Sequence, residues 1–447
     1  MTTETIPDCS GCDAPEPSAG NYFVSSYPPF SCWSKDQLGA VDWALEQPRF
    51  ENNDEAPLGL YVHVPFCAER CHYCYYRSYA KPTHDQTDHY IEALLTELAG
   101  YAQVPAVAGR PLDFVYFGGG TPSLLAPTQI QRLFDGVNRA LPLDQAREIC
   151  FECAPQSATD DRLRVLRDAG VTRISLGVQQ LDDEVLTQSG RIHRVEHVER
   201  AWSRIEPLGF PIVNLDLMVG LVGETDESFF RSLERIIEMG PMSVTIYLLE
   251  IPANTPLFHA LQENRIEQLP AGWDVKRDRL RRGFERLEQS GYSIRSAYAA
   301  VRDVKRGRFV YQEAQYHGAD LLAVGVSSFG YFGGVHYQNH ASLDGYLQRV
   351  TDSGHSRIRA VRLSDQERMV REFILQLKLG GASAAEFRDK FGVSLSEQFA
   401  IPLKECSERG WLISDGHGVR LTRDGLLRID RLLPAFYLPQ HLGKTYW

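Results

Sequence analysis

Three cysteines stand close together in the segment YVHVPFCAERCHYCYY, which covers residues 61–76 and begins within a short apolar run. Cys67, Cys71 and Cys74 are spaced so that one short loop can place three thiolates around one face of an iron–sulfur cube. Three protein ligands leave one iron of a [4Fe-4S] cluster open to a small molecule. The alternative for this loop is a zinc site that also recruits His72. The spacing and the position after a predicted strand favour the open cluster.

The other cysteines give weaker signals. The chain has nine cysteines, and their uneven placement favours reduced thiols and metal ligands over a disulfide framework. The CSGC segment at residues 9–12 can form a redox pair or a second metal clip, although we expect neither. Cys150 and Cys153 fall in a predicted strand and are assigned to packing. Cys32 and Cys406 have no recognisable partner in the sequence.

Strand and helix patterns alternate through the middle of the chain. Six apolar runs lie at residues 60–64, 114–119, 148–154, 173–179, 213–221 and 244–250. Strand–helix units in series predict an α/β fold in which a parallel sheet curls into a partial (β/α)6 barrel, similar to a TIM barrel. Functional side chains are then expected at the carboxyl ends of the strands.

Changes in composition divide the chain into four parts. We predict a tail and aromatic arm at residues 1–54, the barrel at residues 55–300, a glycine-rich segment for the substrate or a second cofactor molecule at residues 301–360, and a helical, winged-helix-like domain at residues 361–447.

The charge and the apolar pattern exclude several classes of protein. The chain of 447 residues has a formal net charge of −11 at pH 7, whereas general nucleic-acid binding depends on an excess of Lys and Arg. Its first residues are acidic and rich in proline, unlike a secretory signal, and no stretch of roughly 18 apolar residues follows. We therefore expect a cytoplasmic protein that binds neither nucleic acid nor a membrane. DNA binding by the C-terminal unit is the alternative to an enzyme.

Two groups of side chains allow two interpretations each. Tyr27, Phe30 and Trp33 in the arm either cover a flat substrate or pack against the main domain, and we favour packing. His193 and His197 are four residues apart and can share a helix face as metal ligands. We interpret them instead as residues of a surface helix.

Residues 55–440 resemble the radical S-adenosylmethionine (SAM) enzymes of the oxygen-independent coproporphyrinogen III oxidase family, with its heme-chaperone, class C methyltransferase and cyclopropanase relatives. The resemblance rests on the cysteine loop, on GGGTPS at residues 118–123 and on motifs at later strand ends. It implies a [4Fe-4S] cluster that reductively cleaves SAM to a 5'-deoxyadenosyl radical in a radical SAM barrel. It also implies a small-molecule substrate and an electron donor such as flavodoxin or ferredoxin.

The resemblance further implies which residues hold SAM. Tyr61 and Tyr73 are similar to the aromatic residues that bind it in the family. Gly119, Gly120 and Thr121 are similar to residues at its methionyl end, where missing side chains let the backbone approach.

Polar residues at later strand ends complete the implied SAM site. Glu152 resembles a glutamate that meets the SAM amino group, and Gln179 resembles a polar residue at the end of the fourth strand. Arg191 is similar to an arginine that pairs with the SAM carboxylate, where a planar fork suits a planar partner. Asp216 resembles an acid that accepts hydrogen bonds from the ribose hydroxyls.

The chain departs from the family pattern at two places. The oxidases carry a further cysteine two residues after the third ligand, where this chain has Tyr76. The heme chaperones carry an HNxxYW-like stretch, where this chain has YQEAQYH at residues 311–317. The segment GVSSFGYFGG does resemble the part that binds a second SAM, with Phe329 as an apolar contact and Gln312 near a family glutamine.

These matches and departures lead to one expected function. We expect a class C methyltransferase or cyclopropanase that uses two SAM molecules on an aromatic or unsaturated metabolite. The alternative is a decarboxylase of heme biosynthesis that resembles the oxygen-independent coproporphyrinogen III oxidases.

Overall fold

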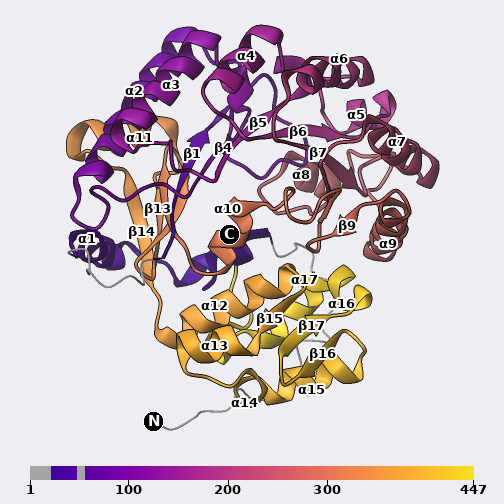
Figure 1. The fold of residues 1–447 in the computed structure, drawn as a ribbon. Coiled ribbons are helices and arrows are strands. Elements are labelled where there is room, and N and C mark those ends of the chain that lie inside the picture. The colour runs from indigo at the N-terminus through magenta and orange to yellow at the C-terminus, as the bar shows by residue number, and fades with distance from the viewer. Residues whose placement is uncertain (1–21, 48–55, 447) are drawn as a thin grey trace.

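A computed structural model describes residues 22–47 and 56–446 of the chain (Figure 1). The CSGC segment at residues 9–12 and the predicted tail lie outside the described residues. Within them, no helix combines the length and the apolar character that crossing a bilayer requires.

One twelve-stranded sheet forms the centre of the molecule, in the order β14-β13-β12-β11-β1-β4-β5-β6-β7-β8-β10-β9. Six of its strands are parallel neighbours. They are β1 (Leu58–Val64), β4 (Phe114–Gly119), β5 (Glu148–Cys153), β6 (Arg173–Gln179), β7 (Ile212–Val219) and β8 (Ser243–Leu248). These are the six strands that the sequence predicts, and the α/β fold with a partial barrel is confirmed.

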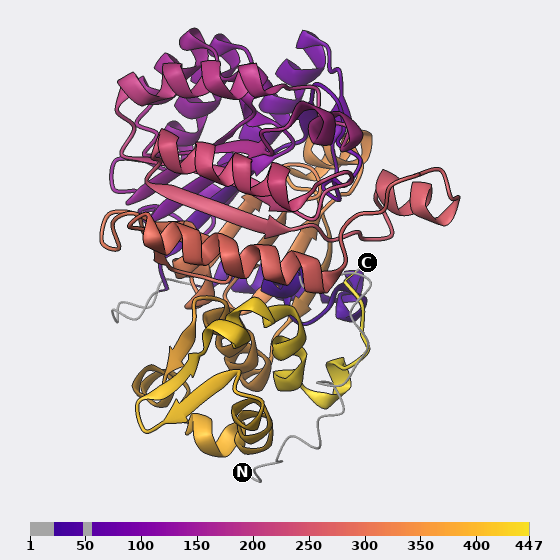
Figure 2. The ribbon, with the colours of Figure 1, turned by 90° about the vertical axis from the view of Figure 1, so that its right-hand side faces the viewer.

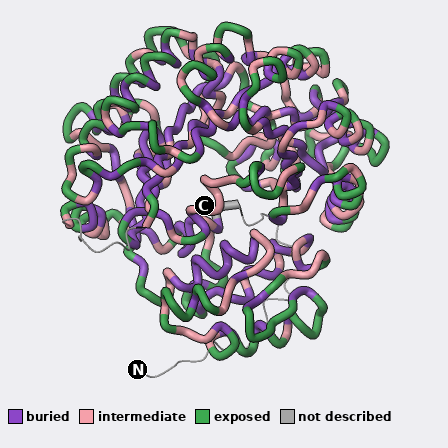
Figure 3. The backbone as a smooth tube through the Cα atoms, viewed as in Figure 1, coloured by how far each residue is buried: buried purple, intermediate pink, exposed green. Residues whose placement is uncertain are grey.

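Helices between the strands cover the outer face of the sheet (Figure 1). They are α2 (His84–Gln103), α3 (Pro127–Ala140), α4 (Asp160–Asp168), α5 (Asp183–Gln188), α6 (Val195–Ile205), α7 (Asp226–Met239) and α9 (Trp273–Gln289), whereas α8 (Pro256–Gln262) lies apart from them (Figure 2). Capping boxes fix the start of the helices at Thr83 and Thr225. Burial is concentrated in the strands and the inner helix faces (Figure 3), whereas the segment around α8 extends outward (Figure 2).

The sheet continues beyond the six parallel strands at both edges. At one edge, β11 (Asp320–Val324) pairs in parallel with β1, followed by the antiparallel strands β12 (Phe329–Phe332), β13 (Val335–Asn339) and β14 (Arg357–Arg362). At the other edge lie β10 (Ala299–Val301) and β9 (Ser293–Ile294). Of the two helices between residues 301 and 360, α10 (Val310–Tyr316) contacts β4 and α11 (Leu343–Ser353) packs against α2. Residues 301–360 thus share the sheet of the barrel, and the division into four parts stays a prediction.

The C-terminal region is a helical domain with a small sheet of order β15-β17-β16. Its elements are α12 (Asp365–Lys378), β15 (Gly381–Ser383), α13 (Ala384–Phe391), α14 (Leu395–Gln398), α15 (Ala400–Glu408), β16 (Leu412–Asp415), β17 (Gly418–Leu421), α16 (Arg423–Leu427) and α17 (Ile429–Leu432). A buried ion pair of 2.7 Å between Arg277 of α9 and Asp430 of α17 joins this domain to the barrel.

The N-terminal arm, which ends in α1 (Leu38–Glu46), lies against both parts. Ser34 bridges to Ala360 of β14, and the Tyr27 hydroxyl accepts a hydrogen bond from the backbone N–H of Leu438. Tyr27 is fully buried and Trp33 is 6% exposed. The arm therefore packs between the barrel and the C-terminal domain, as expected of its aromatic residues.

The cysteine loop (residues 67–74) is fixed by short strands at its two ends. β2 (Phe66–Cys67) pairs with β3 (Tyr79–Ala80), and β2 also accepts one hydrogen bond from the GGGTPS segment. The backbone N–H of Thr121 donates to the carbonyl of Phe66 at 2.7 Å. A Cβ atom at Gly120 would lie 2.7 Å from the same oxygen. The glycine is needed here because the loop and the end of β4 are in direct contact.

Replacing Gly120 by alanine should therefore displace the start of the cysteine loop. We expect Gly120→Ala to lower the free energy of unfolding by about 1–3 kcal/mol, measured by urea denaturation. Gly39 is the matched control, because it lies in α1 and a Cβ there meets no atom within 4 Å. Gly39→Ala should leave stability unchanged or raise it by up to ~1 kcal/mol. Equal unfolding curves for both variants would contradict this packing.

Candidate functional site

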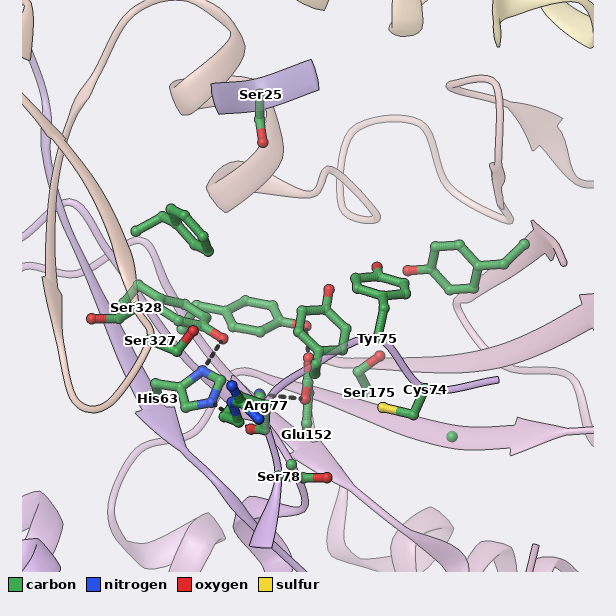
Figure 4. Close-up of a pocket in the computed structure, with 18 of the residues that line it drawn as sticks. Ser25, His63, Cys74, Tyr75, Arg77, Ser78, Glu152, Ser175, Ser327 and Ser328 are labelled. Carbon is green, nitrogen blue, oxygen red and sulfur yellow. Dashed lines mark hydrogen bonds between the residues drawn. The ribbon is translucent and has the colours of Figure 1, made fainter. Parts of the chain in front are cut away.

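One cavity of about 720 Å³ lies at the carboxyl ends of the parallel strands. Every residue that the sequence analysis named for the cluster or SAM lines it: Tyr61, Cys67, Cys71, Tyr73, Cys74, Gly119, Gly120, Thr121, Glu152, Gln179, Arg191, Asp216 and Phe329. Figure 4 shows part of the wall, with Cys74, Ser78 and Glu152 on one side and Ser25 of the arm on the other. The structure brings these positions together, and their contacts with a ligand stay predictions.

The three thiols have distinct surroundings. The Thr121 hydroxyl lies 3.6 Å from Cys67 Sγ, and Arg191 Nη1 donates to Cys71 Sγ at 3.1 Å. The backbone N–H of Cys74 donates to the carbonyl of Cys71. Cysteine binds iron as the thiolate, and a guanidinium N–H can donate a hydrogen bond to that sulfur.

His72 faces away from this wall. Its Nδ1 lies 3.1 Å from the carbonyl oxygen of Gln188, and His72 is not among the residues that line the cavity. Across residues 22–47 and 56–446, no three His, Cys, Asp or Glu side chains are grouped closely enough to hold a single metal ion.

Glu152, at the end of β5, is buried beside two hydrogen-bond donors. The Tyr116 hydroxyl donates to its Oε1 at 2.6 Å, and the backbone N–H of Gly119 donates to its Oε2 at 3.1 Å. Burial, reinforced by the nearby charge of Asp216, raises the pKa of the carboxyl to about 7. A cationic group that enters the cavity would favour the ionised form of Glu152 and could pair with it.

Asp216, on β7, forms a second acidic position. Its Oδ2 accepts a hydrogen bond from the Ser175 hydroxyl at 3.0 Å, and its Oδ1 accepts one from Asn214 Nδ2 at 2.8 Å. Burial raises the pKa of Asp216 to about 6 despite these bonds. The side chain is held in one orientation toward the cavity, as an acceptor for hydroxyl groups requires.

Arg191 is oriented by two acceptors besides Cys71. Its Nη2 donates to the carbonyl of Gly177 at 3.0 Å, and its Nε donates to His193 Nδ1 at 3.2 Å. His193 is fully buried and donates from Nε2 to the carbonyl of Val178, so its assignment to a surface helix was wrong. It lies before α6 and supports Arg191.

The glycines of GGGTPS have a packing role in addition to the one expected. A Cβ atom at Gly119 would lie 2.5 Å from the ring of His63, and Gly120 faces the backbone of Phe66. The backbone N–H of Gly120 donates to the carbonyl of Val64 at 2.8 Å. These glycines make room for neighbouring parts of the chain, and their close approach to SAM is a separate prediction.

Several lining residues were missed by the sequence analysis. His63 was not predicted, and its Nδ1 lies 3.0 Å from the Tyr61 hydroxyl. Tyr116 was not predicted either, and its ring lies 4.4 Å from that of Tyr311. The buried Oε1 of Gln156 has no hydrogen-bond partner among the described residues and is free to accept one from a ligand. The alternation of β1, which puts residues 61 and 63 on one face, is the signal that could have identified His63.

The far side of the cavity is aromatic. Phe329 stacks on Phe30 of the arm with ring centroids 4.8 Å apart, and Gln312 Nε2 donates to the Tyr316 hydroxyl at 3.3 Å.

Tyr76, which stands at the position of the oxidase cysteine, lines the cavity and is 44% exposed. The donor set fits a [4Fe-4S] cluster and SAM, with three thiols, a cation and polar strand ends around one space.

The raised pKa of Glu152 predicts a pH-dependent stability of the metal-free protein. Its pKa rises from 4.5 to about 7 on folding. The contribution of the protonated carboxyl to the free energy of unfolding is therefore fully present below about pH 4.5 and is lost as the pH rises through about 7. Between these pH limits the free energy of unfolding of the wild type should fall by about 3 kcal/mol, a loss that Glu152→Gln should not show. Urea denaturation at about pH 5 and about pH 8 measures the difference. Glu92→Gln, on the exposed face of α2, should follow the wild type, and parallel profiles for all three proteins would refute the prediction.

Family models match two parts of the chain. Residues 61–236 match the Radical SAM superfamily, and residues 363–428 match the HemN C-terminal domain. The first range contains the cysteine loop and the strand ends that line the cavity, except those from residue 243 onward.

Similar proteins cover nearly the whole chain. The heme chaperone HemW of Escherichia coli (strain K12) is 33% identical over 85% of this chain and 98% of its own length. HemW of Bacillus subtilis (strain 168) is 29% identical over 84% of this chain and 98% of its own length. The oxygen-independent coproporphyrinogen III oxidase of Escherichia coli (strain K12) is 29% identical over 86% of this chain and 87% of its own length.

A solved structure agrees with these relatives. Coproporphyrinogen III oxidase (HemN) from Escherichia coli, described as a radical SAM enzyme, superposes with a TM-score of 0.80 at 28% identity. The superposition covers 93% of this chain and 97% of that one. The chain therefore belongs to the radical SAM family that includes the oxygen-independent coproporphyrinogen III oxidases and the HemW heme chaperones.

Proposed function

We propose that the protein is an oxidative decarboxylase, similar to the oxygen-independent coproporphyrinogen III oxidases, that acts on a small organic substrate with carboxylate groups. The observation that supports it most is the single cavity in which the cysteine loop faces Ser25 of the arm across an aromatic-lined space (Figure 4). An enzyme that generates a reactive radical needs its substrate and cofactor in one enclosed space.

Membership of the radical SAM family implies a [4Fe-4S] cluster, SAM, an electron donor and a small-molecule substrate. In the proposal, Cys67, Cys71 and Cys74 hold the cluster. When bound, the cluster supplies the electron that cleaves SAM to methionine and a 5'-deoxyadenosyl radical. Flavodoxin or ferredoxin is the proposed electron donor.

The polar residues of the cavity would orient SAM. Ionised Glu152 would accept hydrogen bonds from the amino group, and Asp216 would accept them from the ribose hydroxyls. Arg191 already donates to Cys71 and so would hold the cysteine loop in register with the end of β6 while it pairs with the SAM carboxylate. Tyr61, Tyr73, Gln179 and the Gly119–Thr121 segment would complete this binding site.

The substrate would occupy the space near the aromatic far side. The substrate would give up one hydrogen atom to the radical that SAM supplies. It would then release carbon dioxide from a neighbouring carboxylate, form a double bond and pass its remaining electron to a one-electron acceptor. The buried arm and the stacked pair of Phe30 and Phe329 would keep water from these steps.

Methyl transfer and cyclopropanation, which the sequence analysis favoured, gain no support from the relatives described above, whereas the oxidase alternative does. A second SAM beside Phe329 and Gln312 stays a prediction. Heme binding is a further candidate because two of the relatives are heme chaperones, although the chaperone motif is replaced by YQEAQYH.

The test is a product analysis of the anaerobically reconstituted protein. We would add dithionite, SAM with a deuterated methyl group and coproporphyrinogen III, and follow the products by mass spectrometry. We expect 5'-deoxyadenosine, carbon dioxide and a product with a new double bond. Cys71→Ser should reduce all three to the background of cluster-free protein, whereas Cys32→Ser, in the arm, should not.

Other outcomes would contradict the proposal in recognisable ways. S-adenosylhomocysteine and deuterium in the product would indicate methyl transfer. Tight heme binding without 5'-deoxyadenosine formation in the presence of substrate would indicate a chaperone. Cluster-loaded protein that forms 5'-deoxyadenosine but releases no carbon dioxide would refute decarboxylation of this substrate.

A further inference from the structure

Three cationic side chains line the cavity from the elements that close its far side. Arg359 lies on β14, and Arg371 and Lys378 lie seven residues apart on α12, which places the last two on the same helix face. Arg371 Nε donates to the carbonyl of Ser25 at 3.2 Å. Figure 4 places Ser25 across the cavity from Glu152 and Ser78. These cations therefore belong to the end of the cavity remote from the cysteine loop.

Neither arginine forms an ion pair with an acid of the described residues. Arg371 is 1% exposed, and its hydrogen bonds go to the backbone oxygens of Ser25 and Gln315. Arg359 donates to Gln338 Oε1 at 2.6 Å. Burial lowers the pKa of both guanidinium groups. Lys378 is 5% exposed and is attracted by the charge of Glu250, as Arg371 is by the charge of Glu372, but neither cation forms an ion pair with these carboxylates among the described residues.

Several other buried arginines in this protein do form ion pairs with acidic side chains. Four of them are paired with buried or nearly buried carboxylates: Arg110 with Asp320, Arg173 with Glu148, Arg277 with Asp430 and Arg279 with Glu224. An unpaired buried charge is costly because it loses its hydration without gaining a partner. Arg371, which is buried, and Arg359, which is half-buried, are exceptions that both line the cavity, which suggests that their missing partner is a ligand.

Aromatic rings support the two guanidinium groups from one side. The Cζ atom of Arg371 lies 4.0 Å from the ring centroid of Tyr331, and that of Arg359 lies 4.9 Å from the ring centroid of Phe30. A guanidinium that stacks on a ring keeps its N–H groups available at its edge, where a planar carboxylate can accept two of them.

We propose that Arg359, Arg371 and Lys378 form an anion-binding subsite for a carboxylate group at the end of the cavity remote from the cluster. The inference rests on the proposed function in placing the ligand inside this cavity. The carboxylate has two sources, a side chain of the substrate or the methionyl end of a second SAM. In either case the subsite anchors one end of a molecule while its other end extends toward the cluster.

The test compares an acid with its neutral ester. Coproporphyrin III, a stable tetracarboxylate, and its tetramethyl ester are titrated by fluorescence into the cluster-loaded protein. We expect the wild type to bind the acid about tenfold or more tightly than the ester. Arg359→Gln and Arg371→Gln should each remove most of this preference. Arg362→Gln, an exposed residue of the same strand as Arg359, should keep it.

A second measurement identifies the source of the carboxylate. Equilibrium dialysis with radiolabelled SAM counts the molecules bound per chain. A lower count in Arg359→Gln and Arg371→Gln assigns the subsite to a second SAM, whereas an unchanged count with a lost acid preference assigns it to the substrate. The inference is overturned if neither quantity changes in folded variants, or if the wild type binds neither porphyrin and the SAM count is unaffected. Because Arg359 is half-buried, Arg359→Gln alone tests the inference if Arg371→Gln does not fold. Both measurements are made without turnover, so a failure of decarboxylation leaves them valid.

Discussion

The hydrogen bond from Arg191 to Cys71 Sγ joins the two parts of the chain on which the whole site depends. One part is the cysteine loop after β1, and the other is the segment that follows β6. A sulfur that is to bind iron suits a charged N–H donor, and a guanidinium held inside the protein needs acceptors. Gly177 and His193 supply the remaining acceptors. The backbone N–H of His72 also donates to the carbonyl of Ser189, which fixes the loop against the same segment.

Charge is distributed unevenly around the cavity. The acidic side chains Glu152 and Asp216 lie at the strand ends near the cysteine loop, whereas Arg359 and Arg371 lie on the far elements. SAM carries an amino group, ribose hydroxyls and a sulfonium charge, which suit acidic neighbours. A carboxylate suits the cationic end. The cavity therefore combines acidic groups with Arg191 at the cysteine-loop end and has arginines without acidic partners at the other end.

The sequence predicted the elements that depend on local pattern. The six parallel strands follow from apolar runs, and the cysteine loop and GGGTPS are recognisable by spacing. It did not predict that residues 301–360 extend the same sheet, because the pairing of β11 with β1 joins segments about 260 residues apart. The burial of His193 and the role of Gly119 were also missed. Both depend on which side chain occupies the neighbouring space, and that is decided by tertiary packing.

The central claim is that three cysteines of this chain hold a cluster with one iron open to SAM. Mössbauer spectroscopy of protein reconstituted with isotopically enriched iron tests it most directly, with spectra taken before and after SAM is added. The account predicts the signal of a [4Fe-4S] cube in which one iron site changes when SAM binds, and the loss of this signal in Cys67→Ser. A single tetrahedral iron, or a cube in which every iron is unaffected by SAM, would contradict it.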